Sequence, residues 1–449
     1  MSRPGPESGQ VKCACGGVKE KSVNDVTQSG CRIAIIGAGP IGLEAGLFAR
    51  QQGYAVTVLE RGRVAENVRN WGHVRLFSPF AMNSSPWGRA LLSETDGTRP
   101  GAGGSLPDGD ELLTGMEFAE RYLIALSRQP LISDSIRENT EVLAIGRDSI
   151  WKTDVFGSQR RNSPFRILVR TPQGEAEVLA DVVLDCSGTY GNHNWLGGGG
   201  VPCRGERECE SRILWTLPDV SGGDRDRFAG RTTLLAGSGY SAATVVVQLA
   251  ALAREVPGTS VIWLSRTQRS PPVSVVPTDS LSERAELTAR ANQCALDPDS
   301  VVDWRPGQIV RAIGAGPGER LTVTVDSDAV STRVEVDEVV ALVGYRPNRS
   351  LYEELQIHEC YATQGPIKLA AALLADAGQD CLEQSCPGPE TLTSPEPDFF
   401  VLGAKSYGRS SQFLLRVGME QIPAVFSLIS GGRAGDDADD TPQTGVVVS

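Results

Sequence analysis

Two glycine-rich turns carry the residues of this sequence that are best suited to chemistry. The first turn runs Gly37-Ala-Gly39-Pro-Ile-Gly42, and Glu60 follows 23 residues after Gly37. In this pattern the first glycine permits a tight turn, the second lets the backbone approach a pyrophosphate, and the third allows a helix to pack closely on a strand. The positive end of the helix attracts the anion, and the acid accepts hydrogen bonds from ribose hydroxyls. We therefore predict a dinucleotide site formed by Gly37, Gly39, Pro40, Gly42, Glu60 and Arg61.

A second turn repeats the pattern with one difference in charge. Gly237-Ser-Gly239-Tyr-Ser-Ala242 precedes an apolar run that ends on Ser265-Arg266, where the first unit has an acid. An acid at this place favours a free ribose 2′-hydroxyl, whereas an arginine accommodates a 2′-phosphate. The alternative is that Arg266 is an ordinary solvated residue after a strand. We predict that this unit binds NADPH through Gly237, Gly239, Tyr240, Ser241 and Arg266.

Each turn must lie between a strand and a helix to act in this way. The runs 32–36 and 55–59 are short and apolar, as in buried parallel strands, and 41–52 has the pattern of a helix. The runs 232–236, 243–253 and 260–264 repeat this order in the second unit. Further strands are expected at 141–147, 165–171, 177–184, 308–313, 321–325, 334–342 and 399–402, and helices at 111–128, 368–377 and 413–429. Segment 67–87 has little periodicity and is interpreted as a site-lining loop, and 270–298 is expected to be weakly ordered.

Composition limits the kinds of partner. The 449 residues include 43 basic and 55 acidic ones, a net charge of −12, which argues against nucleic acid or an anionic membrane surface. No apolar run has the length of a bilayer span, and the first thirty residues lack an apolar signal core, so we expect a soluble cytoplasmic protein. The ten cysteines are then expected to be free thiols. Cys13 with Cys15 would make only an incomplete metal site, and Cys381 with Cys386 is either a redox pair or two spectator thiols.

The order of motifs resembles a known family. GAGPIG with Glu60, DCSGT at a strand end, GSGYSA, GYRPN and a final strand–glycine–helix are similar to the two-dinucleotide-binding-domain flavoproteins. These include thioredoxin-reductase-like enzymes and flavin-containing (class B) monooxygenases. The resemblance covers about residues 30–430 and implies an α/β fold of two Rossmann-like domains, with FAD on the first unit and NADPH on the second. The implied order is a disordered leader (1–30), an FAD domain (31–215), an inserted NAD(P)H domain (216–335), a return to the FAD domain (336–430) and a disordered tail (431–449).

Within this family the cysteine pattern favours the monooxygenase branch. The reductase branch passes electrons through a redox-active dithiol, and this sequence has no CxxC and no cysteine between Glu60 and Asp110. The resemblance therefore implies an enzyme that uses a C4a-peroxyflavin, formed with molecular oxygen, to oxygenate a small soft nucleophile (N or S) or a carbonyl. The alternative is an NADPH-dependent reductase of a protein or quinone acceptor. A third reading is a catalytically silent, redox-sensing flavoprotein.

Four candidate catalytic residues follow. FAMNSSPW resembles the asparagine-containing loop over the flavin, so Asn83 would contact a peroxyflavin or the nicotinamide, unless it is only a turn former. His73 touches substrate or flavin, or has a structural role. Lys405 and Arg409 place positive charge near the reduced flavin, or belong to a solvated loop.

The connecting motifs complete the set of expected cofactor contacts. Asp185–Thr189 and Gly344–Asn348 resemble the two linkers between the domains of the family, and His193 is expected near the domain junction. The usual FxGxxxHxxxY/F fingerprint is absent, and Gly403-Ala404-Lys405 replaces the usual Gly-Asp pair. No metal-binding motif is present, and oligomeric state stays open. The contacts expected from these motifs are Ser187, Gly188, Gly344 and Gly403.

Overall fold

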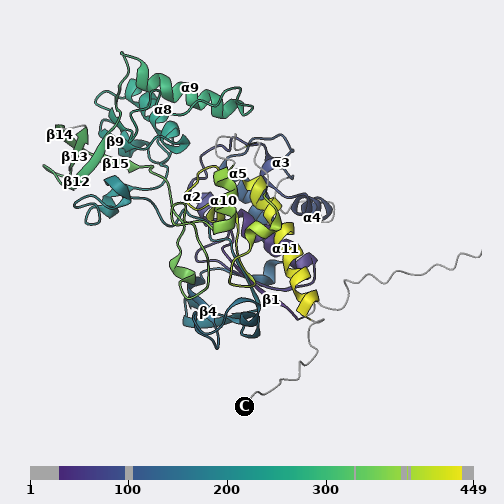
Figure 1. Ribbon diagram of the computed structural model, residues 1–449. Coiled ribbons are helices and arrows are strands. Elements are labelled where there is room, and N and C mark those ends of the chain that lie inside the picture. The colour runs from purple at the N-terminus through teal and green to yellow at the C-terminus, as the bar shows by residue number, and fades with distance from the viewer. Residues whose placement is uncertain (1–29, 97–104, 328–329, 376–381, 383–385, 437–449) are drawn as a thin grey trace, which may run out of the picture.

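The computed structural model describes residues 30–96, 105–327, 330–375, 382 and 386–436. Figure 1 shows two domains: one combines the purple start and the yellow end of the chain, and the other is formed by the teal and green middle. Each has a five-stranded parallel sheet at its centre. The predicted fold, with one Rossmann-like domain inserted into another, is confirmed.

The first sheet has the order β16-β7-β1-β2-β3. Its strands are β1 (Arg32–Ile36), β2 (Ala55–Leu59), β3 (Ile136–Arg137), β7 (Val182–Asp185) and β16 (Phe399–Val401); helices α1 (Pro40–Gln51) and α11 (Leu415–Asp436) and the antiparallel strands β4 (Glu141–Arg147), β5 (Phe165–Thr171) and β6 (Gly174–Ala180) accompany it. Successive β1 side chains face opposite sides. Ile33 and Ile35 pack with α1 and α11, whereas Ala34 and Ile36 pack with β4 and β5. Burial on both sides explains the uninterrupted apolar run in the sequence.

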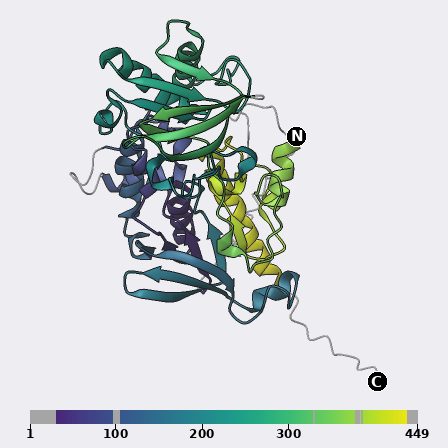
Figure 2. The same cartoon turned by 90° about the vertical axis from the view of Figure 1, so that its left-hand side faces the viewer.

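The second sheet, of order β11-β10-β9-β15-β8, repeats this arrangement. Its elements are β8 (Ile213–Leu214), β9 (Thr232–Ala236), β10 (Ser260–Leu264), β11 (Val302–Arg305), β15 (Glu338–Ala341), the helices α7 (Arg225–Phe228), α8 (Tyr240–Glu255) and α9 (Ser282–Leu296), and the antiparallel strands β12 (Ile309–Ala315), β13 (Leu321–Ser327) and β14 (Val330–Val336). Leu235 packs on the α8 side, and Leu234 packs on the side of β12 and β13. Figure 2 shows the second domain above the first, with strands β4–β6 at the far lower end.

The sequence predicted one strand at each of two segments where the structure has two strands. Segment 177–184 divides into β6 and β7, and 334–342 divides into β14 and β15. An aspartate stands at each break: Asp181 Oδ2 accepts from the N–H of Arg32 at 2.8 Å, and Asp337 Oδ2 accepts from the N–H of Thr232 at 2.8 Å. Each carboxylate ties the break to the first residue of a central strand. The chain therefore leaves an antiparallel strand and enters the parallel sheet at this residue.

One expectation about helices was wrong, and two others were right only in part. The weakly ordered stretch 270–298 contains α9, whose buried Ala291 packs against α8. The site-lining stretch 67–87 contains short helices rather than only loop, and the helix expected at 111–128 starts at Gly115 and includes a π-helical turn. The helices of this region and the remaining helix are α2 (Glu66–Asn70), α3 (Phe80–Asn83), α4 (Pro86–Asp96), α5 (Gly115–Phe118), the π-helix η1 (Ala119–Leu123), α6 (Ile124–Ser127) and α10 (Ile367–Ala375).

Sheet membership shifts the domain limits slightly. β8 and β15 belong to the second sheet, so that sheet spans Ile213 to Ala341 rather than the expected 216–335. Helix α11 continues to Asp436, past the start of the expected tail at 431. The expected leader up to residue 29, the tail from 437, and Cys13, Cys15 and Cys381 lie outside the described residues. Within the described chain, no helix has both the length and the apolar character needed to cross a membrane.

Candidate functional site

The first glycine turn has the geometry that its sequence predicts. Gly37 has a φ of +97°, and a Cβ there would stand 2.9 Å from the carbonyl oxygen of Cys186. A Cβ on Gly42 would lie 1.9 Å from the Gly37 carbonyl oxygen, so only glycine allows α1 to come this close. Pro40 occupies the first turn of α1, where its missing N–H costs nothing.

Gly39 has a different environment. A Cβ at Gly39 would have no heavy atom within 4 Å, so the space above this residue is open on the protein side. Gly39 is also the N-cap of α1, whose first N–H groups have no partner within the helix. Open space beside free N–H donors fits a pyrophosphate.

Glu60 is fixed at the end of β2, beside this turn. Its Oε2 accepts from the N–H of Ala38 at 2.7 Å, and its Oε1 accepts from the N–H of Gly62 at 2.9 Å. The carboxylate is therefore oriented by backbone donors at the edge where a ribose would lie. Arg61 is exposed, and its guanidinium lies 3.2 Å from where a Cβ on Gly191 would stand, so it reaches the first connecting segment.

The second turn repeats these features. Gly237 has a φ of +132°, and a Cβ there would be 2.3 Å from the Leu342 carbonyl oxygen, whereas a Cβ on Gly239 would meet nothing within 4 Å. Trp263 Nε1 donates to the Gly237 carbonyl oxygen at 2.7 Å and fixes the turn on β10. Ser241, in the first turn of α8, is exposed.

Arg266 stands just past the end of β10. It is exposed and has no hydrogen bond or ion pair with another described residue. Arg269, in contrast, donates from Nη2 to the Pro272 carbonyl oxygen at 2.9 Å. Arg266 is therefore the free guanidinium at this end of the unit, in the place expected for a 2′-phosphate contact.

The two units come together at one junction. The ring of Phe77, in the first domain, lies edge-on to Tyr240, the first residue of α8, with 5.5 Å between centroids. The two connecting segments also pair, through an antiparallel bridge between His193 and Tyr345. His193 thus lies at the junction, as expected, where its ring stacks on Trp215 with 3.6 Å between centroids.

The glycines of the connecting motifs adopt left-handed backbone conformations. Gly188, Gly344 and Gly403 have φ values of +68°, +84° and +69°. The N–H and the hydroxyl of Ser187 both donate to Asp185 Oδ1, at 3.1 and 2.6 Å. All these residues follow the carboxyl ends of β7, β15 or β16, which is the edge where ligands bind in open parallel sheets.

Lys405 is not in a solvated loop. Its Nζ donates to Asp185 Oδ2 at 2.6 Å and to Ser187 Oγ at 3.1 Å, and both charged side chains are fully buried. A buried lysine paired with a carboxylate contributes little net charge to its surroundings. The positive charge of Lys405 is therefore balanced by Asp185, and the pair joins β7 to the segment after β16.

Asn83 is buried, and its amide is used within its own loop. Its Oδ1 accepts from the Ser78 hydroxyl at 2.8 Å, and its Nδ2 donates to the carbonyl oxygens of Ser78 and Pro79 at 2.9 and 3.2 Å. This arrangement favours the interpretation of Asn83 as a loop former. His73 Nε2, in the same region, is buried and has no hydrogen-bond partner among the described residues.

A carboxylate that the sequence analysis missed anchors this region. Glu44, fully buried on α1, accepts from the Ser85 hydroxyl at 2.6 Å, from the Ser85 N–H at 3.1 Å and from the Tyr122 hydroxyl. Burial raises the pKa of Glu44 above its ordinary value, although these hydrogen bonds oppose the rise. The only signal in the sequence was an acid within an otherwise apolar helix. Its role is to hold the segment after Asn83 on α1.

Comparisons with known proteins agree with this geometry. Residues 34–149 match a family model described as pyridine nucleotide-disulphide oxidoreductase. No curated protein matches the chain. Bacillithiol disulfide reductase from Bacillus cereus is similar in structure, with a TM-score of 0.62, 16% identity and coverage of 89% of this chain and 99% of that one. The chain has the fold of the two-dinucleotide-binding-domain flavoproteins.

Monooxygenases share this fold. An ornithine N-hydroxylase from Kutzneria sp. 744 has a TM-score of 0.57 and 15% identity, over 89% of this chain and 99% of that one. A flavin-containing monooxygenase from Stenotrophomonas maltophilia has a TM-score of 0.53 and 17% identity, over 90% of this chain and 99% of that one. At identities this low the likeness shows the fold alone. It confirms the fold that the family resemblance implied.

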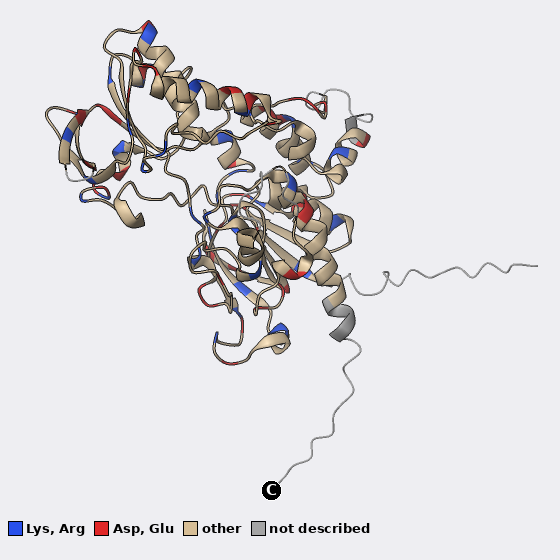
Figure 3. Ribbon diagram, turned by 45° about the horizontal axis from the view of Figure 1, so that its top comes forward, with Lys and Arg blue, Asp and Glu red and all other residues tan. Residues whose placement is uncertain are grey.

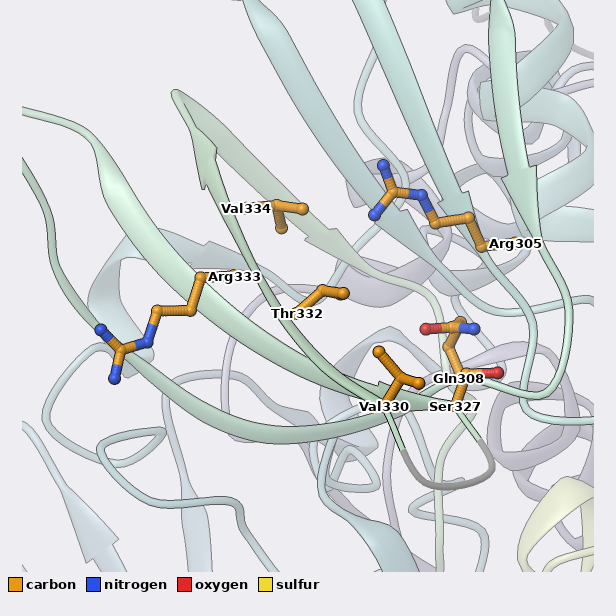
Figure 4. Close-up of a pocket in the computed structure, with 7 residues that line it drawn as sticks. All are labelled: Arg305, Gln308, Ser327, Val330, Thr332, Arg333 and Val334. Atoms are coloured by element: carbon orange, nitrogen blue, oxygen red, sulfur yellow. The ribbon is translucent and has the colours of Figure 1, made fainter.

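A surface cavity lies apart from the glycine turns. It has a volume of about 430 Å³ and lies between the end of β11 and strands β13 and β14. Figure 4 shows Arg305 and Arg333 on different sides of the hollow, with guanidinium groups that do not converge. Arg305 is paired with Asp303 at 2.5 Å. The cavity therefore does not have the convergent charges of an anion site.

Proposed function

We propose that the chain is an FAD-dependent, NADPH-driven monooxygenase that oxygenates a small molecule at a soft N or S atom or at a carbonyl. One observation carries this proposal: the chain has two glycine turns, each with open space beside its second glycine, and the domains that carry them meet through Phe77 and Tyr240. Two nucleotides bound at these turns would extend toward the same interdomain space. This is the arrangement that hydride transfer between them requires.

The residues of the chain have separate tasks in this proposal. Gly39 and the start of α1 hold the FAD pyrophosphate, and Glu60 holds the adjoining ribose. Gly239 and Arg266 bind NADPH. Bound FAD would supply the acceptor for hydride from NADPH and the donor of electrons to dioxygen. The buried anchor formed by Glu44 keeps the segment around Asn83 closed on the first domain, which limits the access of water.

A flavoprotein reductase of a protein or quinone acceptor is the second candidate, and the likeness to bacillithiol disulfide reductase favours it. Cys186 and Cys203 support the first candidate instead. The sequence has no CxxC, and no disulfide joins the cysteines that the structure describes. Burial raises the pKa of Cys186 well above its ordinary value, and burial together with Glu206 raises that of Cys203 to about 12. Such thiols stay protonated and are poor nucleophiles.

Product analysis tests the proposal. Flavin-loaded protein is reduced with NADPH without oxygen and then mixed with isotopically labelled dioxygen and a panel of small amines, thioethers and ketones. We expect flavin reduction, followed by a product that carries one labelled oxygen atom. Reduction by NADPH followed only by release of hydrogen peroxide, across the whole panel, would contradict monooxygenation.

A thiol variant tests the second candidate. Cys381→Ser with Cys386→Ser should leave NADPH-driven turnover within about twofold, because half-burial raises the pKa of Cys386 to about 11 and leaves it unreactive. Flavin content is measured in parallel. A large loss of turnover in a variant that still binds and reduces its flavin would favour the reductase instead.

A further inference from the structure

Three arginines lie close together where the two domains join. Arg346 belongs to the second connecting segment, Arg349 follows that segment directly, and Arg409 follows the short helix η8 (Gly403–Tyr407). Partial burial and the charges of Arg346 and Arg349 lower the pKa of Arg409 below its ordinary value. Asn194 links two of these arginines, because its Oδ1 accepts from Arg409 Nη1 at 3.2 Å and its Nδ2 donates to the carbonyl oxygen of Tyr345, the residue before Arg346, at 3.4 Å. Figure 3 shows basic segments in blue along this junction, in a chain whose net charge is −12.

The hydrogen bonds of Arg409 orient it without cancelling its charge. Its Nε donates to Gln364 Oε1 at 2.9 Å, and its Nη1 donates to Asn194 Oδ1 at 3.2 Å. Both acceptors are neutral amides. Arg349, in contrast, donates from Nη1 to the carboxylate of Glu359 at 2.9 Å. Within the described part of the chain, Arg409 has no carboxylate partner.

Arg346 is positioned by its backbone and by an aromatic ring. Its N–H donates to the Asn192 carbonyl oxygen at 2.9 Å, and its guanidinium carbon lies 5.9 Å from the centroid of the Trp195 ring. The guanidinium has no hydrogen bond or ion pair with another described residue. A guanidinium has five N–H donors, so Arg346 presents most of its binding capacity to whatever enters the junction.

The location of the arginines points to a ligand that reaches both domains. Asn194 follows β7, Arg409 follows β16, and Arg346 follows β15, so all three lie beyond carboxyl ends of central strands. The N–H of Asn194 donates to the Gly344 carbonyl oxygen at 3.0 Å and ties two of these segments together. The same edges carry both glycine turns. A molecule held here would lie beside the space in which the two nucleotides are proposed to meet.

We propose that Arg346 and Arg409 bind the anionic group, a carboxylate or small oxyanion, of the substrate. This inference rests on the proposed function, since it names the substrate class of that site. Paired guanidinium groups match the geometry of a carboxylate, and an anion would relieve their mutual repulsion. The nicotinamide nucleotide also carries phosphates, but the second unit has its own free cation for them, Arg266.

Sulfate binding tests the site directly. The flavin-loaded full-length protein is titrated with inorganic sulfate at constant ionic strength, without nicotinamide nucleotide, and Kd is obtained from the rise in Tm. Arg346→Gln and Arg409→Gln should each weaken sulfate binding by about tenfold, as expected for the loss of one charge-assisted hydrogen bond. Arg333→Gln, an exposed arginine on β14, is the matched control and should leave Kd unchanged.

Matched substrates test the chemical class. Small thioethers and amines are compared in pairs, each as the carboxylate and as its neutral amide, by kcat/KM for product that gains one oxygen. The wild type should prefer the carboxylate, and Arg346→Gln should reduce this preference by about tenfold, mainly through KM.

Two outcomes would overturn the inference. One is that the wild type and the double variant, Arg346→Gln with Arg409→Gln, bind sulfate with the same Kd. The other is that Arg266→Gln loses sulfate binding while Arg346→Gln binds sulfate as the wild type does. The anion site would then belong to the nicotinamide nucleotide. Failure of NADPH to reduce the flavin of the wild type would instead refute the proposed function, and the sulfate titration would still decide whether the arginine site exists.

Discussion

Replacing Arg266 with alanine should change the choice of nicotinamide cofactor. Arg266 is exposed, follows the end of β10 and has no partner among the described residues, so its removal breaks no contact in that part of the protein. Folding and flavin content should therefore be unaffected. The effect should appear only when a ligand carries a phosphate at this end of the second unit.

The size of the effect follows from the charge on the guanidinium. A hydrogen bond to a charged group contributes about 1.5–3 kcal/mol, and each 1.4 kcal/mol is a factor of about ten. Arg266→Ala should therefore lower the efficiency of flavin reduction by NADPH by roughly 10–100-fold. Exposure to solvent favours the lower end of this range. NADH has no 2′-phosphate and should be nearly unaffected.

The assay is stopped-flow reduction of the flavin with each nucleotide, with kcat/KM or its single-turnover equivalent compared between proteins. Arg269→Ala is the matched control, because Arg269 is held by the Pro272 carbonyl oxygen and should not share the phosphate. An unchanged NADPH/NADH ratio in Arg266→Ala would mean that this arginine is a solvated strand end. A larger change in the NADPH/NADH ratio in Arg269→Ala than in Arg266→Ala would mean that Arg269, not Arg266, contacts the phosphate.

Three further predictions concern the first domain. Gly39→Val should fold but bind little FAD, because the valine side chain would enter the open space in which the pyrophosphate is proposed to lie. Gly146→Val is the control: its side chain also enters open space, and this variant should keep its flavin absorbance. Equal flavin content in the two variants would contradict the proposed site. Lys405→Met should lower the free energy of unfolding by about 3–5 kcal/mol, because the charge of Asp185 is left buried without its cation. Adding Asp185→Asn should restore part of this free energy. If the losses from the two substitutions are additive in urea titrations, the two residues do not stabilise the protein as a pair. Glu44→Gln tests pH dependence: burial raises the folded-state pKa of Glu44 above 4.5, so its contribution to stability is present at low pH and is lost as pH rises through the folded pKa. As pH rises through this pKa, the free energy of unfolding of Glu44→Gln should fall less than that of the wild type. Parallel curves of unfolding free energy against pH for the two proteins would refute this prediction.

Some features of the protein depend on local sequence alone. A glycine with positive φ, a helix start and a short apolar strand are each determined by neighbouring residues, so both strand–turn–helix units, the ends of β1, β2, β9 and β10, and the steric need for glycine at Gly37 and Gly42 were predictable. The two-domain fold followed because the same unit occurs twice. The absence of CxxC was likewise a property of the sequence.

Other features depend on which distant segments meet. The breaks at Asp181 and Asp337 arise because each carboxylate bonds to the start of a strand far away in the sequence, which no local pattern reveals. Lys405 was expected either to place positive charge near the flavin or to belong to a solvated loop, but the pairing of β16 with β7 brings it to Asp185. Asn83 could be a catalytic amide or a loop former on sequence grounds, and the hydrogen-bond partners within its loop distinguish the two.

The sequence by itself therefore determined the two nucleotide-binding units and their difference in charge, because these depend on residues within one strand–turn–helix segment. Only the tertiary structure decided which charges are paired. Lys405 is neutralised by a carboxylate, whereas Arg346 and Arg409 meet at the junction without one in the described chain, since three strands that are distant in sequence end at the same place. The charge of a site is the sum over all segments that converge there, and convergence is a property of the fold.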